Sequence, residues 1–328
     1  MTQNPIHLAV RKHGPNPVNL AGAPLNEWPS YKQPEYDFDL SKARLMRSNF
    51  TGQEELRYAN LQGAKLAGAE LSGTHLVGAD LHKADLFMAV LNEANLLGCD
   101  LREATLDDAN LQWATLFRAD LTQASLKSAD LSSADMRGAN LKEAILITAC
   151  LRGAKLRRAD LTQANLKDAD LAGAHLQGAN LTKASLKSAD LSSADMHGAD
   201  LKEAILITAC LRGAKLRRAD LTQANLKDAV LAGSHLQGAN LTKANLRGAD
   251  MSSVKLAEAD LSEADLRGVK HLYLKDLRHA KLHKTKGAIR IRLVGIALWL
   301  GEILTKLVGG FLKILSLSIA KIQGLLHS

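Results

Sequence analysis

The sequence lacks proline almost throughout. All six prolines lie within the first 34 of the 328 residues. Proline has no backbone N–H to donate, so within β-sheets it is confined to edges, strand starts and bulges. A chain that avoids proline from residue 35 onward is therefore consistent with a backbone whose N–H groups are all needed in a hydrogen-bonded ladder.

Cysteine is also scarce, and its odd number argues against a disulfide framework. The three cysteines are Cys99, Cys150 and Cys210, and none has a histidine or a second cysteine at the spacing of a zinc site. The N-terminus has no charged-then-apolar signal segment. These absences predict no metal and no cofactor, and they favour a reducing compartment, which we expect to be the cytoplasm.

What the sequence has instead is a period of five residues. Every fifth position from Leu56 to Leu266 is leucine or methionine, 43 positions in a row. The residue two places earlier is nearly always alanine, and the residue between them is usually Asp, Asn, Ser or Lys. This period fits neither a strand nor a helix, whose side chains repeat every 2.0 and 3.6 residues. It predicts a solenoid whose wall turns once in each repeat.

Packing in a narrow solenoid explains the repeat. If each repeat forms one side of a square, four repeats close one coil. The leucine then fills the axis with the small residue beside it, while the residue before the leucine and the two after it face water. Coils stacked at the strand spacing of about 4.8 Å give about eleven coils and a rod of roughly 50 Å.

The repeat carries a family resemblance. Segments such as Ala79-Asp80-Leu81, Ala119-Asp120-Leu121 and Ala159-Asp160-Leu161 resemble the pentapeptide-repeat family. The resemblance covers most of the chain and implies an all-β solenoid, the right-handed quadrilateral β-helix. It implies no shared active site, because the repeated residues are structural. Some members of the family are acidic mimics of DNA that bind type II topoisomerases, which makes such a role an alternative here.

The pattern divides the chain into three parts. Residues 1–37 hold all the prolines and are typical of an extended leader. Residues 38–282 form the predicted β-helix, whose spacing slips by one residue around 52–55 and again near His271. These slips predict irregular coils at both ends. Residues 283–328 form a basic linker and a predicted helix.

The β-helix contains an internal duplication. Residues 121–180 match residues 181–240 at 55 of 60 positions. The duplicated segment is three whole coils, or twelve repeats, so the copy keeps every side aligned and lengthens the rod by roughly 14 Å at the strand spacing. A catalytic centre gains nothing obvious from such a copy, whereas a binding surface is extended by it.

The four sides of the coil differ in charge. We name them by their central residues: the basic side (Leu56 to Leu256), the first acidic side (Leu61 to Leu261), the apolar side (Leu66 to Leu266) and the second acidic side (Leu71 to Met251). The basic side has ten Lys and Arg residues against four acidic ones. The first acidic side has six basic against eleven acidic residues, and the second has two against six.

The basic side is predicted to bind a partner through two clusters in the duplicated segments. They are Lys155, Arg157 and Arg158, and the copies Lys215, Arg217 and Arg218. Such cations suit an acidic protein or phosphates, and the alternative is that charged walls only keep the solenoid soluble. Nucleic acid is a weaker prediction, because the strip has almost no aromatic residue for base stacking beyond Phe117.

A few outward residues on the apolar side are hydrophobic. They are Ile145, Ile147, Ile205 and Ile207, with Phe87 and Met88 nearer the N-terminus. The two isoleucine pairs lie three coils apart, so they form separate patches unless the residues nearer the N-terminus widen them. Each patch is either a small interface or an ordinary group of surface residues.

The C-terminal segment predicts a cationic amphipathic helix from Ile289 to Leu326. At 100° per residue most of its charged residues fall in one arc, with most apolar residues opposite. The predicted contact residues are Arg292, Trp299, Leu300, Lys306, Leu307, Phe311 and Lys313. Its longest uncharged stretch is nine residues, too short to span a bilayer. An anionic membrane interface is favoured, and a homodimer contact or a cap on the solenoid is the alternative.

These features together predict a scaffold without enzymatic activity. No catalytic set or phosphate-binding loop is visible in the sequence, and the narrow interior leaves no room for a small-molecule substrate. We expect the sides of the rod to bind a protein partner, and the C-terminal helix to attach the cytoplasmic chain to a membrane surface or to a second copy. The alternative function is that of a DNA mimic which binds a topoisomerase such as gyrase.

Overall fold

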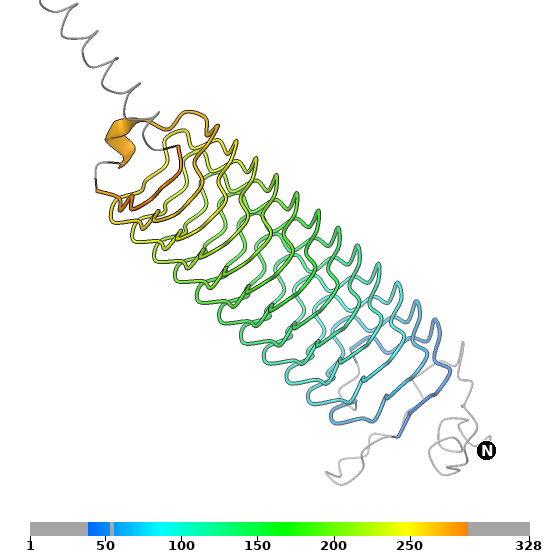
Figure 1. Ribbon diagram of the computed structural model, residues 1–328. Coiled ribbons are helices and arrows are strands. Elements are labelled where there is room, and N and C mark those ends of the chain that lie inside the picture. The colour runs from blue at the N-terminus through cyan, green and yellow to red at the C-terminus, as the bar shows by residue number, and fades with distance from the viewer. Residues whose placement is uncertain (1–38, 53–55, 278, 288–328) are drawn as a thin grey trace, which may run out of the picture.

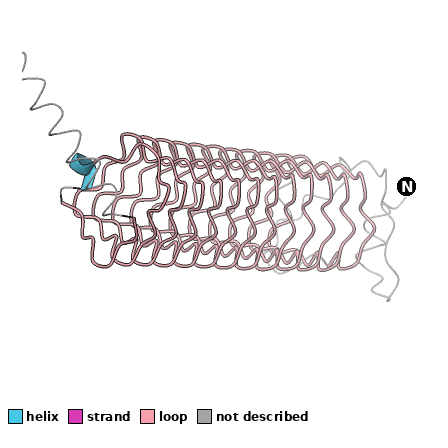
Figure 2. Cartoon of the chain, turned by 45° about the horizontal axis from the view of Figure 1, so that its top comes forward, coloured by secondary structure: helices cyan, strands magenta, loops and turns pink. Residues whose placement is uncertain are grey.

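The chain folds into a rod of stacked coils. The computed structural model describes residues 39–52, 56–277 and 279–287. Over these residues the coils follow one another along a single axis (Figure 1), and a second view shows the same regular stack (Figure 2). This is the solenoid that the five-residue period predicts.

Parallel β-bridges link each coil to the next. Asn60 pairs with Asp80, Asp80 pairs with Asp100, and the same step of four repeats recurs on all four sides as far as the pair Asp250 and Lys270. Within the described residues these bridges are isolated pairs, and the structure has no longer strand. The bridges confirm the predicted coil of four repeats.

Backbone hydrogen bonds run between coils in both directions. Around Leu61, the leucine N–H donates to the carbonyl of Asp80 at 2.7 Å, and Gly63 N–H donates to His82 at 2.8 Å. Asp80 N–H donates back to the carbonyl of Ala59 at 2.9 Å. Because these bonds recur in every coil, the ladder uses most of the backbone donors, in agreement with the lack of proline.

Each repeat closes with a tight turn. Ala64 N–H donates to the carbonyl of Leu61 at 2.9 Å, and Gly63, the second residue after the leucine, has a φ of 64°. The same position has positive φ from residue 58 to residue 268, also where a larger residue such as Lys83 (φ 58°) stands. Glycine adopts this conformation without strain, whereas another residue costs on the order of 1 kcal/mol.

Leucine and alanine fill the interior. The leucine or methionine at every fifth position between Leu56 and Leu266 is at most 1% exposed, and Phe50 fills the axis of the first coil at 1%. The neighbouring inward residue is buried too, as Ala124 beside Leu121 illustrates. This confirms the predicted arrangement, in which the interior is too narrow for two large side chains in one repeat.

Both predicted register slips are present. Near the N-terminus Asp39 pairs with Asn60, and near the C-terminus Asp260 pairs with Lys281, so in both places the step is one residue longer than four repeats. At the second slip a short 3-10 helix, η2 (Leu274–Leu277), follows the last regular coils (orange in Figure 1). The ladder then continues to Lys286.

Two predicted parts lie outside the described residues. They are the leader, residues 1–37, and the amphipathic helix with its residues Arg292, Trp299, Leu300, Lys306, Leu307, Phe311 and Lys313. In the part of the chain that the structure describes, no helix is both long enough and apolar enough to cross a membrane.

Candidate functional site

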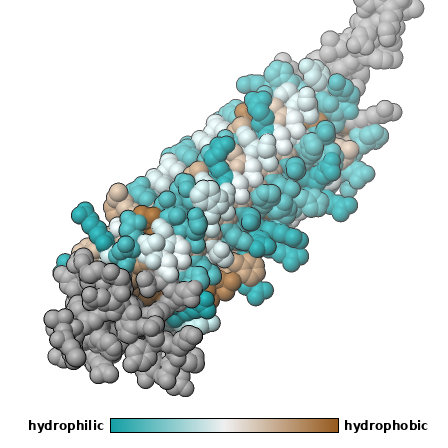
Figure 3. All heavy atoms as spheres, turned by 180° about the vertical axis from the view of Figure 1, so that it is seen from behind, coloured by the Kyte–Doolittle hydropathy of each residue, from teal (hydrophilic) through white to brown (hydrophobic). Residues whose placement is uncertain are grey.

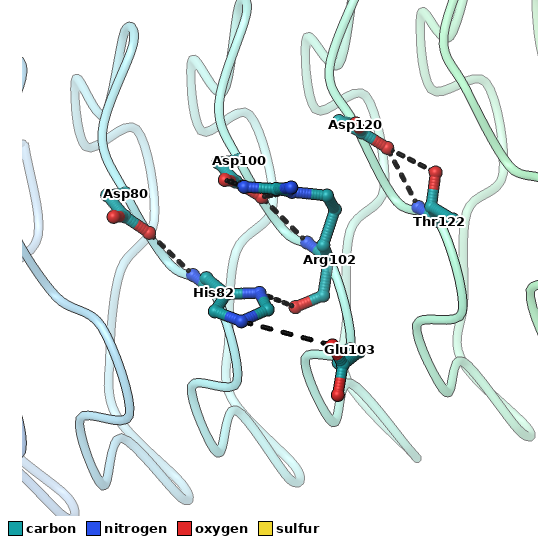
Figure 4. Close-up of polar contacts among 7 residues, drawn as sticks. All are labelled: Asp80, His82, Asp100, Arg102, Glu103, Asp120 and Thr122. Carbon is teal, nitrogen blue, oxygen red and sulfur yellow. Dashed lines mark hydrogen bonds and ion pairs between the residues drawn. The ribbon is translucent and has the colours of Figure 1, made fainter.

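One backbone N–H in each repeat does not join the ladder, that of the first residue after the leucine. Where Asp or Asn precedes the leucine, its side chain accepts this N–H: His82 N–H donates to Asp80 Oδ1 at 2.9 Å, and Thr122 N–H to Asp120 Oδ1 at 3.0 Å (Figure 4). The frequent Asp and Asn of the repeat therefore satisfy a donor that no backbone carbonyl of the coil reaches.

Two neighbouring repeats on the basic side lack this acceptor. Lys155 and His175 stand where Asp or Asn would be, and their coils are bridged to each other. Among the described residues, the N–H groups of Arg157 and Gln177 consequently have no hydrogen-bond acceptor. Two unpartnered amides thus lie in successive coils on a surface rich in cations.

The duplication repeats this arrangement three coils further along the rod. Lys215 and His235 replace the usual acceptor, and the N–H groups of Arg217 and Gln237 have no acceptor in the described part of the chain. In the coil between these two pairs the corresponding amide has an acceptor, because His197 N–H donates to the Asp195 carboxylate at 3.2 Å. Ala257 N–H, which follows Lys255 in the next coil, also has no acceptor among the described residues. The basic side therefore carries two groups of adjacent open amides, one at Arg157 and Gln177 and one at Arg217, Gln237 and Ala257.

Cations on the basic side also have fewer carboxylate partners than cations elsewhere. All six basic residues of the first acidic side lie within 4.0 Å of a carboxylate, as Lys142 Nζ does at 3.3 Å from Asp160. Of the six predicted contact residues on the basic side, only Lys215 has such a partner among the described residues, Asp195 at 3.9 Å. Much of the positive charge on this side is therefore not neutralised.

An open cleft of about 500 Å³ lies over the first cluster. It is lined by Arg137, Lys155, Arg157, His175, Gln177 and His197. These residues come from four successive coils, since their positions follow the step of four repeats between bridged residues. Guanidinium, ammonium, imidazole and amide groups converge there, a set of donors suited to carboxylates and phosphates.

The remaining predicted arginines lie beside glycines of the next coil. A Cβ at Gly178 would lie 3.8 Å from Cγ of Arg158, and a Cβ at Gly238 would lie 3.6 Å from Cγ of Arg218. Both arginines are exposed, and neither has an ion-pair partner among the described residues. The glycines leave space for each arginine stem, so both guanidinium groups remain available to a partner.

Phe117, which lies on the basic side two coils before the first cluster, is already covered by cations. The guanidinium carbons of Arg118 and Arg137 lie 5.2 and 5.6 Å from the centre of the Phe117 ring. These distances are within the range of cation–π contact. Phe117 is therefore a poor platform for a nucleic-acid base.

His235 responds to the cations around it. Burial, followed by the positive charges of Lys255, Arg217 and Lys215, lowers the pKa of this imidazole below its usual 6.5. His235 is therefore neutral at pH 7 and becomes charged only in acid.

The repeat identifies the family. The family model described as pentapeptide repeats matches the chain with 8 copies, at residues 55–87, 89–123, 124–163, 164–202, 209–248 and 234–270. The chain belongs to the pentapeptide-repeat family. Proteins of this family fold as right-handed β-helices, in agreement with the stacked coils described above.

Several solved structures of pentapeptide-repeat proteins are similar to this chain. HetL from the cyanobacterium Nostoc sp. strain PCC 7120, involved in heterocyst differentiation regulation, is 36% identical over 67% of this chain and 90% of its own, with a TM-score of 0.30. A protein of the Arabidopsis thaliana thylakoid lumen is 32% identical over 30% and 68%, with a TM-score of 0.30. QnrB1, a plasmid-mediated fluoroquinolone resistance protein, is 19% identical over 56% and 88%, with a TM-score of 0.37. None of the curated proteins matches the chain.

On this pentapeptide-repeat rod the predicted apolar residues stay in separate patches. Ile145 and Ile147 are half-buried and Ile205 is 39% exposed, while Ile207 is half-buried. Two polar coils separate the isoleucine pairs, since the bridges run from Ile145 through Asn165 and Ser185 to Ile205. The face drawn in Figure 3 is likewise mainly hydrophilic, with small hydrophobic patches.

One cysteine lies inside the rod and the other two lie on its wall. Cys99 replaces an inward alanine, its thiol donates to the carbonyl of Leu76 at 2.6 Å, and burial raises its pKa to about 12. Cys150 and Cys210 are half-buried on the second acidic side. In the described part of the chain, no group of three His, Cys, Asp or Glu side chains could hold a metal ion.

The neutral members of the cleft were not predicted from the sequence. His175, Gln177 and His197 add nothing to a count of Lys, Arg, Asp and Glu, and the open amides depend on which residue precedes each leucine. The step of four repeats contained the signal, because it places Lys155 and His175 in adjacent coils.

Proposed function

We propose that this pentapeptide-repeat protein is a non-enzymatic scaffold whose basic side binds an acidic protein partner. The observation that carries the proposal is the contrast in ion pairing. Cations on the first acidic side are paired within the rod, whereas Arg157, Arg158, Arg217 and Arg218 have no carboxylate partner among the described residues. Charge that is unpaired within the rod can pair with a partner instead.

The proposal of a scaffold also rests on the shape of the molecule. The interior is filled by leucine and alanine, and the cleft is an open depression on the outer wall. Small-molecule sites in enzymes are usually concave and largely enclosed. A long, regular wall with a duplicated segment suits recognition of another macromolecule better than catalysis.

The test is charge reversal on the basic side. The variant carries Arg157→Glu, Arg158→Glu, Arg217→Glu and Arg218→Glu, and the probe is a fluorescein-labelled peptide of about twelve residues that alternates Glu with Thr and spans roughly 40 Å when extended. Fluorescence anisotropy at about 0.15 M salt should show binding by the natural chain and loss of binding by the variant, because exposed charges still act within a Debye length of about 8 Å.

A matched control separates this surface from net charge. The control variant carries Lys142→Glu, Lys167→Glu, Lys202→Glu and Lys227→Glu, four duplicated positions on other sides. It changes the net charge by the same amount but leaves the basic side intact. It should therefore keep most of the affinity for the peptide. Equal loss in both variants, or no loss in either, would contradict a docking surface on the basic side.

The C-terminal segment extends the proposal to attachment. Residues 283–328 carry +6 of the chain's formal charge of +8, and the predicted cationic helix suits an anionic membrane surface at the cytoplasmic face or contact with a second copy. Flotation with anionic and neutral liposomes, comparing the full chain with one that ends at Lys286, tests the first role. Absence of flotation by both chains would leave dimerisation or capping as the role of this segment.

A DNA-mimicking protein that binds a topoisomerase is the alternative function. It is favoured by the first acidic side, where eleven acidic residues exceed six basic ones. It predicts that the chain inhibits supercoiling by gyrase or relieves poisoning by a fluoroquinolone. No effect in a supercoiling assay would remove this alternative.

A further inference from the structure

We propose that the open amides of the basic side are carboxylate-binding sites, and that two such sites hold an extended acidic segment of a protein partner along the rod. This inference rests on the proposed function, and it names the chemistry that the partner presents. It also gives the two halves of the duplication a joint role.

The rod itself shows which group these amides accept. In other coils the same N–H binds a carboxylate oxygen of the preceding Asp, as Thr162 N–H does with Asp160 Oδ1 at 3.0 Å. At Arg157 and Gln177 the preceding residue is Lys155 or His175, which leaves the position of the carboxylate empty in both repeats. A Glu or Asp side chain of a partner has the same acceptor group and can occupy that position.

The surroundings favour an anion in this position. The two amides lie in adjacent coils, roughly 4.8 Å apart along the rod, and both residues line the cleft of about 500 Å³. Lys155 lines the cleft as well, and neither Lys155 nor Arg157 forms an ion pair with a carboxylate among the described residues. Charge-assisted hydrogen bonds are stronger than neutral ones, so a carboxylate gains from both the amides and the cations.

Open amides alone do not make such a site. The residue before the leucine is also not Asp or Asn at Ile145 and Ile205, where the N–H groups of Ile147 and Ile207 have no acceptor among the described residues. Those repeats present isoleucines instead of Lys and Arg. The combination of open amides and unpaired cations occurs in both halves of the duplication on the basic side.

The spacing of the two sites defines the shape of the partner segment. Equivalent amides, such as those of Arg157 and Arg217, are three coils apart, which is roughly 14 Å at the strand spacing. An extended peptide advances about 3.4 Å per residue, so side chains four residues apart are also about 14 Å apart and point to the same side. Acidic residues at positions i and i+4 of an extended segment therefore reach both sites.

The test gives two of the open amides a hydrogen-bond acceptor within the chain and leaves the formal charge unchanged. In His175→Asn with His235→Asn, the new side chain accepts the N–H of Gln177 and Gln237, as Asn180 accepts that of Thr182 at 3.1 Å. Histidine counts as neutral in the formal charge, so its exchange for Asn leaves the formal charge unchanged. The alternating Glu and Thr peptide should bind this variant about tenfold more weakly than the natural chain, because two acceptor positions are already taken.

The matched control removes the same imidazoles but keeps the amides open. His175→Ala with His235→Ala should bind the peptide about tenfold more tightly than the Asn pair, since alanine offers no acceptor and leaves both N–H groups available to the peptide. Ser185→Asn serves as a second control, because it fills the open N–H of Lys187 on the apolar side. Circular dichroism shows that each variant keeps its fold.

The outcomes separate this inference from the proposed function. Equal affinities of the Asn and Ala pairs would overturn the carboxylate sites, while loss of binding on charge reversal would still uphold the basic side as the docking surface. Duplex DNA of similar length is the competing ligand. Tighter binding of DNA than of the peptide, with the same sensitivity to the Asn pair, would overturn the acidic protein segment in favour of phosphates.

Discussion

At the scale of single residues, the interior shows how strictly the repeat selects its side chains. Ser234 stands where the first copy has Ala174, and its buried hydroxyl has no partner among the described residues. Thr74 is buried as well, but its hydroxyl donates to the carbonyl of Phe50 at 2.8 Å. A buried polar group without a partner costs about 1–3 kcal/mol, so the substitution in the copy is expected to weaken its coil.

Exchanging Ser234 and its counterpart Ala174 tests that cost. Ser234→Ala should raise the free energy of unfolding by about 1 kcal/mol, and Ala174→Ser should lower it by a similar amount. Urea unfolding followed by circular dichroism measures both changes. A decrease in stability for Ser234→Ala would contradict this description of the interior.

The cysteines give a second test at this scale. Cys99 is buried with a pKa of about 12, so its thiolate, the reactive form, is almost absent at pH 8. Iodoacetamide should therefore modify Cys150 and Cys210 in the folded chain, and Cys99 only after unfolding in urea. Mass spectrometry of the digested protein identifies the modified residues, and rapid alkylation of folded Cys99 would be inconsistent with an inward thiol.

At the scale of the repeat, the sequence predicted the coil well because one residue type reports each structural role. Leucine marks the axis, alanine marks the narrow interior, and the interruptions near residue 53 and His271 marked both slips. The helix η2 was not predicted. Leu272 before it and Leu277 at its end keep the five-residue spacing, although the backbone between them forms a 3-10 helix and not a regular coil.

The hydrogen-bonding of the candidate site could not be predicted in the same way. A charge count by sides averages over the rod, so it found the basic side but not which cations are paired. Pairing depends on neighbours one coil apart, as for Lys83 and Glu103. The open amides were missed because the role of Asp before the leucine becomes visible only in the structure, where Asp80 accepts the N–H of His82.

The Asp before the leucine should be a measurable stabilising group. Asp160 accepts both the N–H and the hydroxyl of Thr162, so Asp160→Ala should lower the free energy of unfolding by about 1 kcal/mol, like loss of a helix N-cap. Lys155→Ala is the control, because Lys155 accepts no backbone N–H. Equal losses in urea unfolding for the two variants would argue against this role.

These carboxylates also set the response to acid. A hydrogen bond from Arg267 lowers the pKa of Asp265, and one from Ser262 lowers that of Asp260. A carboxylate with a lowered folded pKa stabilises the fold above its unfolded pKa of about 3.9, and this contribution is lost as pH falls through the folded pKa. The melting temperature should therefore change little between pH 5 and pH 8 on this account and fall below about pH 4. An unchanged melting temperature down to about pH 2 would contradict it.

At the scale of the whole molecule, the duplication lengthens the rod without rotating its sides. Deletion of residues 181–240 removes three coils, so it should shorten the rod by roughly 14 Å while the remaining sides stay aligned. Small-angle X-ray scattering measures the maximum dimension of both chains. Loss of the fold on deletion, instead of a shorter rod, would contradict stacking in independent coils.

The same deletion tests the central claim, that the duplicated basic side binds one acidic segment at two sites. The shortened chain keeps Lys155, Arg157 and Arg158 but loses their copies. The measurement is the affinity of the full and the shortened chain for the alternating Glu and Thr peptide, by fluorescence anisotropy. Two linked sites predict that affinity falls at least tenfold in the shortened chain, and equal affinity of the two chains would contradict the claim.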